Sequence, residues 1–187
     1  MTKLEKYNNL HKQLAPTDTG ETGSFCLAFF DDVINITGGG KILEIGFNRG
    51  ASALKWLIDT NVELTSVDIR QRQVSIDLLK KEFGERFNFK LLNSNDLDRE
   101  INWIGMFNVI FIDGEHSYSG VLNDIKKSLT LKPNYLFFDD YHHGNHRQDI
   151  LNAIGLFPQL EFIKDYPSFA NEFEASCGQA LYKVNYA

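Results

Sequence analysis

Cysteine and proline are scarce in this sequence, and long apolar runs are missing from it. The 187 residues include two cysteines, Cys26 and Cys177, and four prolines. Two cysteines form neither a disulfide framework nor a metal-ligand spacing, so we expect reduced thiols in a cytoplasmic protein. The longest apolar stretch, around Phe25–Phe30, is too short to span a bilayer. The first ten residues lack the apolar segment of a signal peptide. These absences argue against secreted disulfide-rich proteins and against membrane proteins.

Positive charge is also limited. Lysine and arginine together number 19 against 25 acidic residues, which gives a net charge of −6. Because basic residues do not cluster, nucleic acid is not an expected partner. A hydrophobic content of 43%, with 15 phenylalanines, favours a packed domain over a disordered chain. The length suits one domain, with residues 1–40 as a helical and loop extension and residues 41–187 as the core.

Strand-like and helix-like segments alternate from Lys41 onward. Apolar runs predict strands at 41–45, 62–69, 87–92, 107–113 and 135–140. Helical spacing predicts helices at 51–59, 72–83, 118–129 and 146–157. Segments 160–166 and 178–184 have no helix between them and predict an antiparallel pair. The fold class is therefore α/β: a Rossmann-like, doubly wound, mostly parallel seven-stranded sheet with helices on both faces.

Polar and acidic residues follow the ends of the predicted strands. The first strand ends in a glycine-rich turn at 46–50, and the second ends in Asp68. Asn93–Asp96 follow the third strand, Asp113 ends the fourth, and Asp139 and Asp140 end the fifth. In doubly wound sheets, ligands bind beyond the carboxyl ends of the strands. This edge is the expected site.

The glycine turn and Asp68 indicate a ligand that contains adenosine. Gly46 and Gly50 permit a tight turn and close approach of the backbone to a ligand. Asp68 follows Gly50 by 18 residues and can accept both hydroxyls of a ribose. A dinucleotide fingerprint needs glycine where Asn48 stands, and no lysine follows Gly50 as a P-loop requires. The candidates are a dinucleotide and S-adenosylmethionine.

Five stretches of the chain together resemble a known enzyme family. They read LEIGFNRGAS, SVDI, NSNDL, FNVIFIDGEHSYSGVLNDI and LKPNYLFFDDYHH. These stretches resemble the successive motifs of class I S-adenosylmethionine-dependent methyltransferases. The IDGEHSY and DDY motifs are similar to those of metal-dependent O-methyltransferases that act on sugars and other small molecules. The resemblance implies methyl transfer to a hydroxyl group of such an acceptor.

The resemblance also assigns roles to residues. The turn from Gly46 to Gly50 would hold the methionine part of the cofactor, with Glu44 beneath it. Asp68 would hold the ribose, and Ile69 would pack on the adenine. The expected cofactor-binding residues are Glu44, Gly46, Asn48, Gly50, Ser52, Asp68, Ile69, Asn95, Asp96 and Asp113.

A divalent metal and a general base complete the predicted site. Asp113, Asp139 and Asp140 are expected to hold Mg²⁺ or another divalent cation, which prefers oxygen ligands. A metal-bound hydroxyl loses its proton more easily. The predicted catalytic bases are Glu115 and His116. A structural role for His116, in shaping its turn, stays open.

Three further questions stay open at this stage. The loop Tyr141–Arg147 carries three histidines, which could contact substrate, bind a softer metal or be solvated. The enzyme could instead be metal-independent, with Glu115 or His116 as its base, or the chain could bind an adenosine ligand without turnover. The apolar segment Ser24–Ile34 could cover a pocket or join a partner in a homo-oligomer, and Asp165–Gly178 should line the acceptor pocket.

Overall fold

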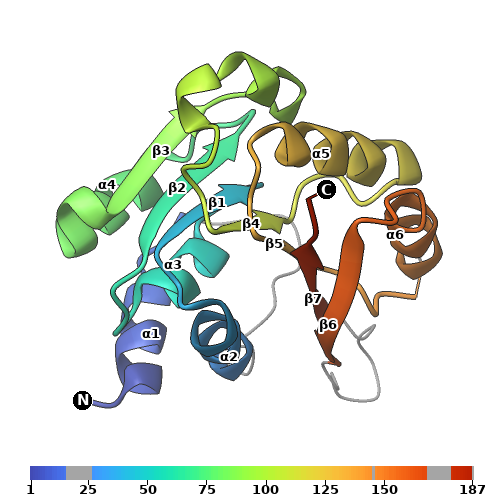
Figure 1. Cartoon of the computed structure of the whole chain (residues 1–187). Helices are drawn as coiled ribbons and strands as arrows, with labels where there is room; N and C mark the ends of the chain where they lie inside the picture. The colour runs from blue at the N-terminus through green and yellow to red at the C-terminus, as the bar shows by residue number, and fades with distance from the viewer. Residues whose placement is uncertain (16–26, 145, 168–177, 187) are drawn as a thin grey trace.

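The computed structural model describes residues 1–15, 27–144, 146–167 and 178–186. Its centre is a seven-stranded sheet with the strand order β3-β2-β1-β4-β5-β7-β6 (Figure 1). The strands are β1 (Lys41–Ile45), β2 (Glu63–Asp68), β3 (Phe87–Leu91), β4 (Val109–Ile112), β5 (Tyr135–Phe138), β6 (Leu160–Tyr166) and β7 (Gln179–Val184). Strands β1 to β5 pair in parallel, and β7 is antiparallel to both β5 and β6. The predicted fold class is confirmed.

Helices cover both faces of this sheet. The α-helices are α1 (Lys3–His11), α2 (Leu27–Thr37), α3 (Ala51–Leu57), α4 (Gln73–Phe83), α5 (Tyr118–Thr130) and α6 (Arg147–Ile154). Short 3₁₀ helices lie at η2 (Gly84–Arg86), η3 (Ser94–Arg99) and η4 (Ile101–Trp103). The described helices contain no segment long and apolar enough to cross a membrane.

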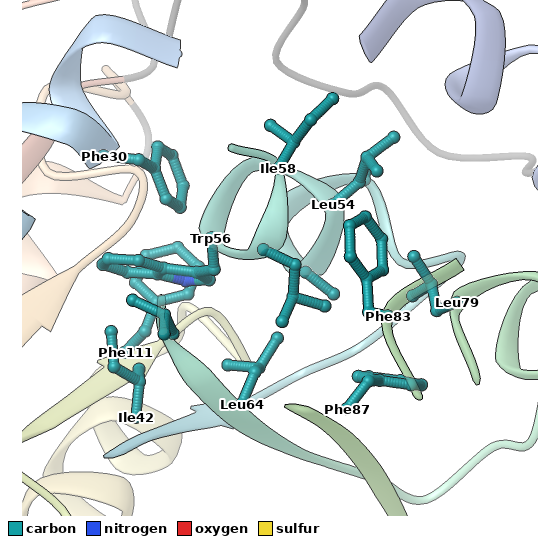
Figure 2. Close-up of a cluster of buried hydrophobic side chains, with 14 of the residues drawn as sticks. Phe30, Ile42, Leu54, Trp56, Ile58, Leu64, Leu79, Phe83, Phe87 and Phe111 are labelled. Atoms are coloured by element: carbon teal, nitrogen blue, oxygen red, sulfur yellow. The ribbon is translucent and has the colours of Figure 1, made fainter. Parts of the chain in front are cut away.

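Two buried clusters fix the helices on the sheet. The first lies between the sheet and helices α1 to α4, and it holds most of the aromatic core. Figure 2 shows Phe30, Trp56 and Phe111 gathered in it. The Phe30 ring lies 4.6 Å from that of Trp56 and 5.6 Å from that of Phe111, in edge-to-face geometry. The second cluster packs α5 and α6 against the opposite face. Burial on both faces explains why the central strands are continuous apolar runs.

The chain changes direction between β1 and β4. It runs outward from β1 to β3 and then returns to β4, which pairs with the free side of β1. This is the topological switch point, where doubly wound sheets bind ligands. The glycine turn after β1 and Asp113 after β4 therefore meet there.

Several predicted element ends were wrong by one to three residues. Helix α3 stops at Leu57 rather than residue 59, because Ile58 is extended and Asp59 adopts a positive φ of 53°. Strand β5 stops at Phe138, and Asp140 has a φ of 54°, so both acids lie on the turn beyond the strand. Residues 168–177 of the predicted loop Asp165–Gly178, and residues 24–26 of the apolar segment Ser24–Ile34, lie outside the described residues.

Candidate functional site

The glycine turn holds β1 and β4 in close contact at the switch point. Gly46 has a φ of 96°, and a Cβ built on it would lie 1.9 Å from the backbone oxygen of Asp113. Gly50 has a φ of 89°, and a Cβ there would meet the Phe47 ring at 2.8 Å. Both positions require glycine, for backbone conformation and for space. Asn48 also has a positive φ, of 46°, which asparagine tolerates better than most residues.

Asp68 holds this turn in place. Its Oδ2 atom accepts hydrogen bonds from the backbone N–H groups of Phe47, at 2.9 Å, and Asn48, at 2.8 Å. Its Oδ1 atom accepts from the backbone N–H of Arg70, at 2.8 Å. A carboxylate has about four acceptor directions, and these three bonds leave about one of them for a ribose hydroxyl. Asp68, which was predicted to hold the ribose, therefore also orders the glycine turn.

Glu44 lies fully buried beneath the turn. The Ser66 hydroxyl donates to its Oε2 atom at 2.5 Å. Burial raises the pKa of Glu44 to about 7, and the hydroxyls of Ser52 and Ser66 partly offset that rise. Ser52 lies in the first turn of α3, and its side chain hydrogen-bonds to Glu44.

The predicted adenine contacts follow β2 and β3 at the same edge. Ile69 is 65% exposed, which is unusual for isoleucine and leaves an apolar surface beside Asp68. Asn95 is exposed, and its backbone N–H donates to Oδ1 of Asn93 at 3.0 Å. Asp96 forms an ion pair with Arg99 at 2.8 Å. Ile69, Asn95 and Asp96 thus follow the carboxyl ends of β2 and β3, at the edge of the sheet where Asp68 lies.

The acids Asp113, Asp139 and Asp140 lie together beyond β4 and β5. Burial, and then repulsion from Asp139, raise the pKa of Asp113 well above its usual range. Burial, and then the charge of Asp140, raise the pKa of Asp139. The amide of Gln179, at the start of β7, donates to Oδ1 of Asp139 at 2.5 Å. The carboxylates therefore form one electrostatically linked group.

His116 lies between two of these carboxylates. Its Nε2 atom is 3.7 Å from Oδ1 of Asp113 and 3.5 Å from Oδ2 of Asp140. Its ring lies 5.3 Å from that of His146, which stacks on His143 at 4.6 Å. Two histidines of the loop Tyr141–Arg147 thus extend the group of polar side chains outward from His116.

Glu115, the other predicted base, has a structural contact instead. Its Oε1 atom accepts the Ser117 hydroxyl at 2.7 Å, and Ser117 is the N-cap residue of α5. The side chain also lies against Gly120, where a Cβ would meet Glu115 Cβ at 2.8 Å. Glu115 therefore supports the start of α5.

The side chains of Asp113, Asp139 and Asp140, which were predicted to bind a metal ion, are not arranged as a metal site in the structure. Across the described ranges, no three His, Cys, Asp or Glu side chains are arranged to hold one. One oxygen of Asp139 accepts from Gln179, and Asp140 is close to His116. We therefore derive no chemical step through a metal.

Sequence reasoning missed three polar residues of this region. Lys55 is buried in α3, Asp124 is buried in α5, and Gln179 is buried at the start of β7. Lys55 and Asp124 lie among residues at helical spacing and carry no motif. Lys55 and Asp124 differ from charged surface residues only in their burial, and burial depends on tertiary packing.

A family comparison identifies the class of protein. The model of the methyltransferase domain family matches residues 43–141, more than half of the chain. The chain belongs to this methyltransferase family. The predicted enzyme class is thereby confirmed. The comparison with curated protein sequences finds no match.

Solved structures share the fold at low sequence identity. An O-methyltransferase from Bacillus cereus, in complex with S-adenosylhomocysteine, is 15% identical with a TM-score of 0.73, covering 98% of this chain and 90% of that one. The O-methyltransferase TomG from Streptomyces achromogenes, in complex with S-adenosylmethionine, is 12% identical with a TM-score of 0.73, covering 100% and 91%. The N-methyltransferase NodS from Bradyrhizobium japonicum is 15% identical with a TM-score of 0.68, covering 96% and 98%. One fold thus serves O- and N-acceptors, and the acceptor must be argued from the site.

Proposed function

We propose that this protein transfers the methyl group of S-adenosylmethionine to a hydroxyl of a small molecule such as a sugar. The observation that carries the proposal is the switch point, where the Asp68-ordered glycine turn meets Asp113. Family membership supports methyl transfer, and the complexes of similar structures with S-adenosylmethionine or S-adenosylhomocysteine support the cofactor. Glu44, Gly46, Asn48, Gly50, Ser52, Asp68, Ile69, Asn95, Asp96 and Asp113 are its proposed binding residues.

The reaction needs alignment and proton removal rather than a covalent intermediate. The sulfonium already activates the methyl group, so the acceptor oxygen must approach in line with the sulfur. We assign proton removal to His116, since the carboxylates of Asp113 and Asp140 flank its Nε2 atom. The Asp140 carboxylate would stabilise the imidazolium that forms when His116 accepts the hydroxyl proton. Glu115 is the weaker candidate because its carboxylate already accepts from Ser117.

Binding and transfer can be tested separately. Titration calorimetry should show binding of S-adenosylmethionine and S-adenosylhomocysteine, and weaker or no binding of NAD. Transfer of a labelled methyl group is then measured across a panel of hydroxylated acceptors. Preferential binding of NAD would refute the cofactor assignment, and cofactor binding with no transfer to any acceptor would favour a non-catalytic module.

Substitution of the two candidate bases distinguishes them. His116→Asn should lower methyl transfer by about 100-fold or more while leaving affinity for S-adenosylhomocysteine unchanged, since general-base catalysis contributes about 10²–10⁴-fold. Glu115→Gln, the matched control, should retain most activity. A larger loss of methyl transfer in Glu115→Gln than in His116→Asn would assign the general-base role to Glu115 instead.

A further inference from the structure

A buried acid of α5 takes no part in the proposed reaction. Asp124 is 3% exposed, although a carboxylate is rarely buried without partners that compensate its desolvation. Its Oδ1 atom accepts a long hydrogen bond, of 3.5 Å, from the side-chain amide of Asn123. The side chain of Ser94 also hydrogen-bonds to this carboxylate. Because Ser94 lies at the start of η3, the carboxylate joins α5 to the loop that follows β3.

The other oxygen of this carboxylate packs on the turn after β4. A Cβ built on Gly114 would lie 2.8 Å from Oδ2 of Asp124 and 3.5 Å from a methyl carbon of Ile45. The first distance is too short for a contact between carbon and oxygen, so no side chain fits between Gly114 and Asp124 as they are placed. Gly114 also differs from Gly46, because its φ lies outside the positive range that favours glycine. Glycine at position 114 is therefore explained by the space that the Asp124 carboxylate occupies.

His116 lies in the same turn, two residues after Gly114. The turn is also held where it enters α5, because Ser117 is the N-cap residue and its hydroxyl accepts from the backbone N–H of Gly120 at 3.2 Å. A Cβ built on Gly120 would lie 2.7 Å from the backbone oxygen of Glu115, so the two backbones are in close contact. The backbone on both sides of His116 therefore packs against α5.

The loop after β3 packs on the same helix. It forms η3, which begins at Ser94 and carries the proposed adenine contacts. The Leu97 side chain of η3 is fully buried, in the same cluster as the apolar side chains of α5. About one turn of α5 beyond Asp124, the ammonium of Lys127 lies 2.6 Å from the carboxylate of Asp98. Asp124 thus lies where α5 meets both the adenine loop and the turn that carries the proposed base.

We propose that Asp124 is a positioning residue, whose carboxylate fixes the turn that carries His116 against the loop that begins at Ser94. This inference rests on the proposed function, because it concerns the geometry of the same site. Asp124 contacts neither cofactor nor acceptor in this role. It acts through the backbone of Gly114, which determines where the His116 imidazole lies, and through Ser94, which determines where the adenine loop begins.

The NMR signal of His116 and the affinity for S-adenosylhomocysteine test this role without an acceptor. In Asp124→Ala, the imidazole Cε1–H resonance of His116, identified by its absence in His116→Asn, should move, whereas that of His11 in α1 should not. Calorimetry should show about tenfold weaker binding of S-adenosylhomocysteine, since a hydrogen bond to the adenine loop is lost. Asp124→Asn keeps the size of the side chain and can still accept from Ser94, so it should stay close to the unsubstituted protein in both measurements. An unchanged resonance or affinity in Asp124→Ala, or equal changes in the two variants, would overturn the proposal.

A cycle of substitutions at the close contact gives a second test. Gly114→Ala should destabilise the unsubstituted protein because the new Cβ meets the buried carboxylate, which Asp124→Ala removes. In the Asp124→Ala background, the effect of Gly114→Ala on the unfolding equilibrium constant, from urea unfolding, should therefore be smaller by about tenfold or more. Gly144→Ala is the matched control and should combine additively with Asp124→Ala, because no atom of the described residues lies within 4 Å of its built Cβ.

Additive effects of Gly114→Ala and Asp124→Ala would overturn the close contact on which the proposal depends. If Asp124→Ala does not fold, Asp124→Ser takes its place in both tests. Calorimetry of S-adenosylhomocysteine with the unsubstituted protein is independent of these variants. Absence of binding there refutes the proposed function, whereas the His116 resonance and the cycle report on Asp124 alone.

Discussion

Gly46 makes the closest approach between β1 and the turn after β4. Its φ of 96° and the 1.9 Å separation of a built Cβ from the Asp113 oxygen leave no space for a side chain. Gly46→Ala should therefore lower the free energy of unfolding by about 3 kcal/mol or more, from strain and a forced shift of β4. Urea unfolding measures the loss. Gly105→Ala is the matched control: its φ is 71° with no atom within 4 Å, so about 1 kcal/mol is expected. Equal losses would refute the steric argument.

Asp68 links the predicted cofactor contact to the order of the turn. Asp68→Ala removes the acceptor of the Phe47 and Asn48 N–H groups as well as the proposed ribose ligand. Charge-assisted hydrogen bonds contribute about 1.5–3 kcal/mol each, so affinity for S-adenosylhomocysteine should fall by about 100-fold. Calorimetry measures it, and Asp77→Ala, an exposed acid of α4, is the control. Unchanged affinity in a folded Asp68→Ala protein would contradict both roles.

The sequence alone predicts some site residues and not others, for a physical reason. Gly46 and Asp68 could be predicted because the position of a turn glycine, or of an acid at the end of a strand, follows from the local sequence around it. The same local reading did not predict that Asp68 binds the amides of the turn, because that contact joins residues about 20 apart. The local sequence also did not predict the burial of Lys55, whose ammonium contacts the ring of Phe30 in another helix.

Helix α5 carries a buried acid that makes stability depend on pH. Burial raises the pKa of Asp124 to about 6 from its usual 3.8. The folded protein thus binds this proton more tightly than the unfolded chain, so the stabilising effect of the proton is present below about pH 4 and is lost as pH rises to about 6. The loss is about 3 kcal/mol, from 1.36 kcal/mol per pKa unit.

Asp124→Asn tests this assignment, because asparagine is neutral at every pH. The stability of the unsubstituted protein relative to Asp124→Asn, from urea unfolding, should fall between pH 4 and 6 and stay level from pH 6 to 8. The exposed Asp77, replaced by asparagine, is the control and should show no such fall. A pH-independent difference for Asp124→Asn would mean that the acid titrates normally in the folded state.

At the level of elements, alternating apolar runs and helical spacing predicted the sheet and its antiparallel last pair, because each pattern is local. Element ends were less predictable, since they depend on single backbone conformations such as that of Asp59. Contacts between distant elements were not predictable at all. The bond from Gln179 to Asp139 joins residues 40 apart and forms only when β7 inserts beside β5.

For the whole molecule, the proposed cofactor site makes stability depend on ligand. S-adenosylhomocysteine at about 100 times its Kd should raise the free energy of unfolding by about 2.7 kcal/mol, because it binds only the folded chain. We expect the same increase, and the same rate of methyl transfer once an acceptor is found, in the presence of excess EDTA. The reason is that, among the described residues, no three His, Cys, Asp or Glu side chains are arranged to hold a metal ion.

Addition of Mg²⁺ and Mn²⁺ after EDTA treatment completes the test. Neither ion should change the ligand-dependent increase or the transfer rate of the unsubstituted protein. Asp139→Asn serves as the comparison: if a metal acted through this acid, EDTA would reduce the unsubstituted protein to the activity of the variant. Transfer that stops in EDTA and returns with Mg²⁺ would restore the metal prediction for Asp113, Asp139 and Asp140. In that case these acids would have to move on metal binding, since Asp139 now accepts from Gln179 and Asp140 lies beside His116.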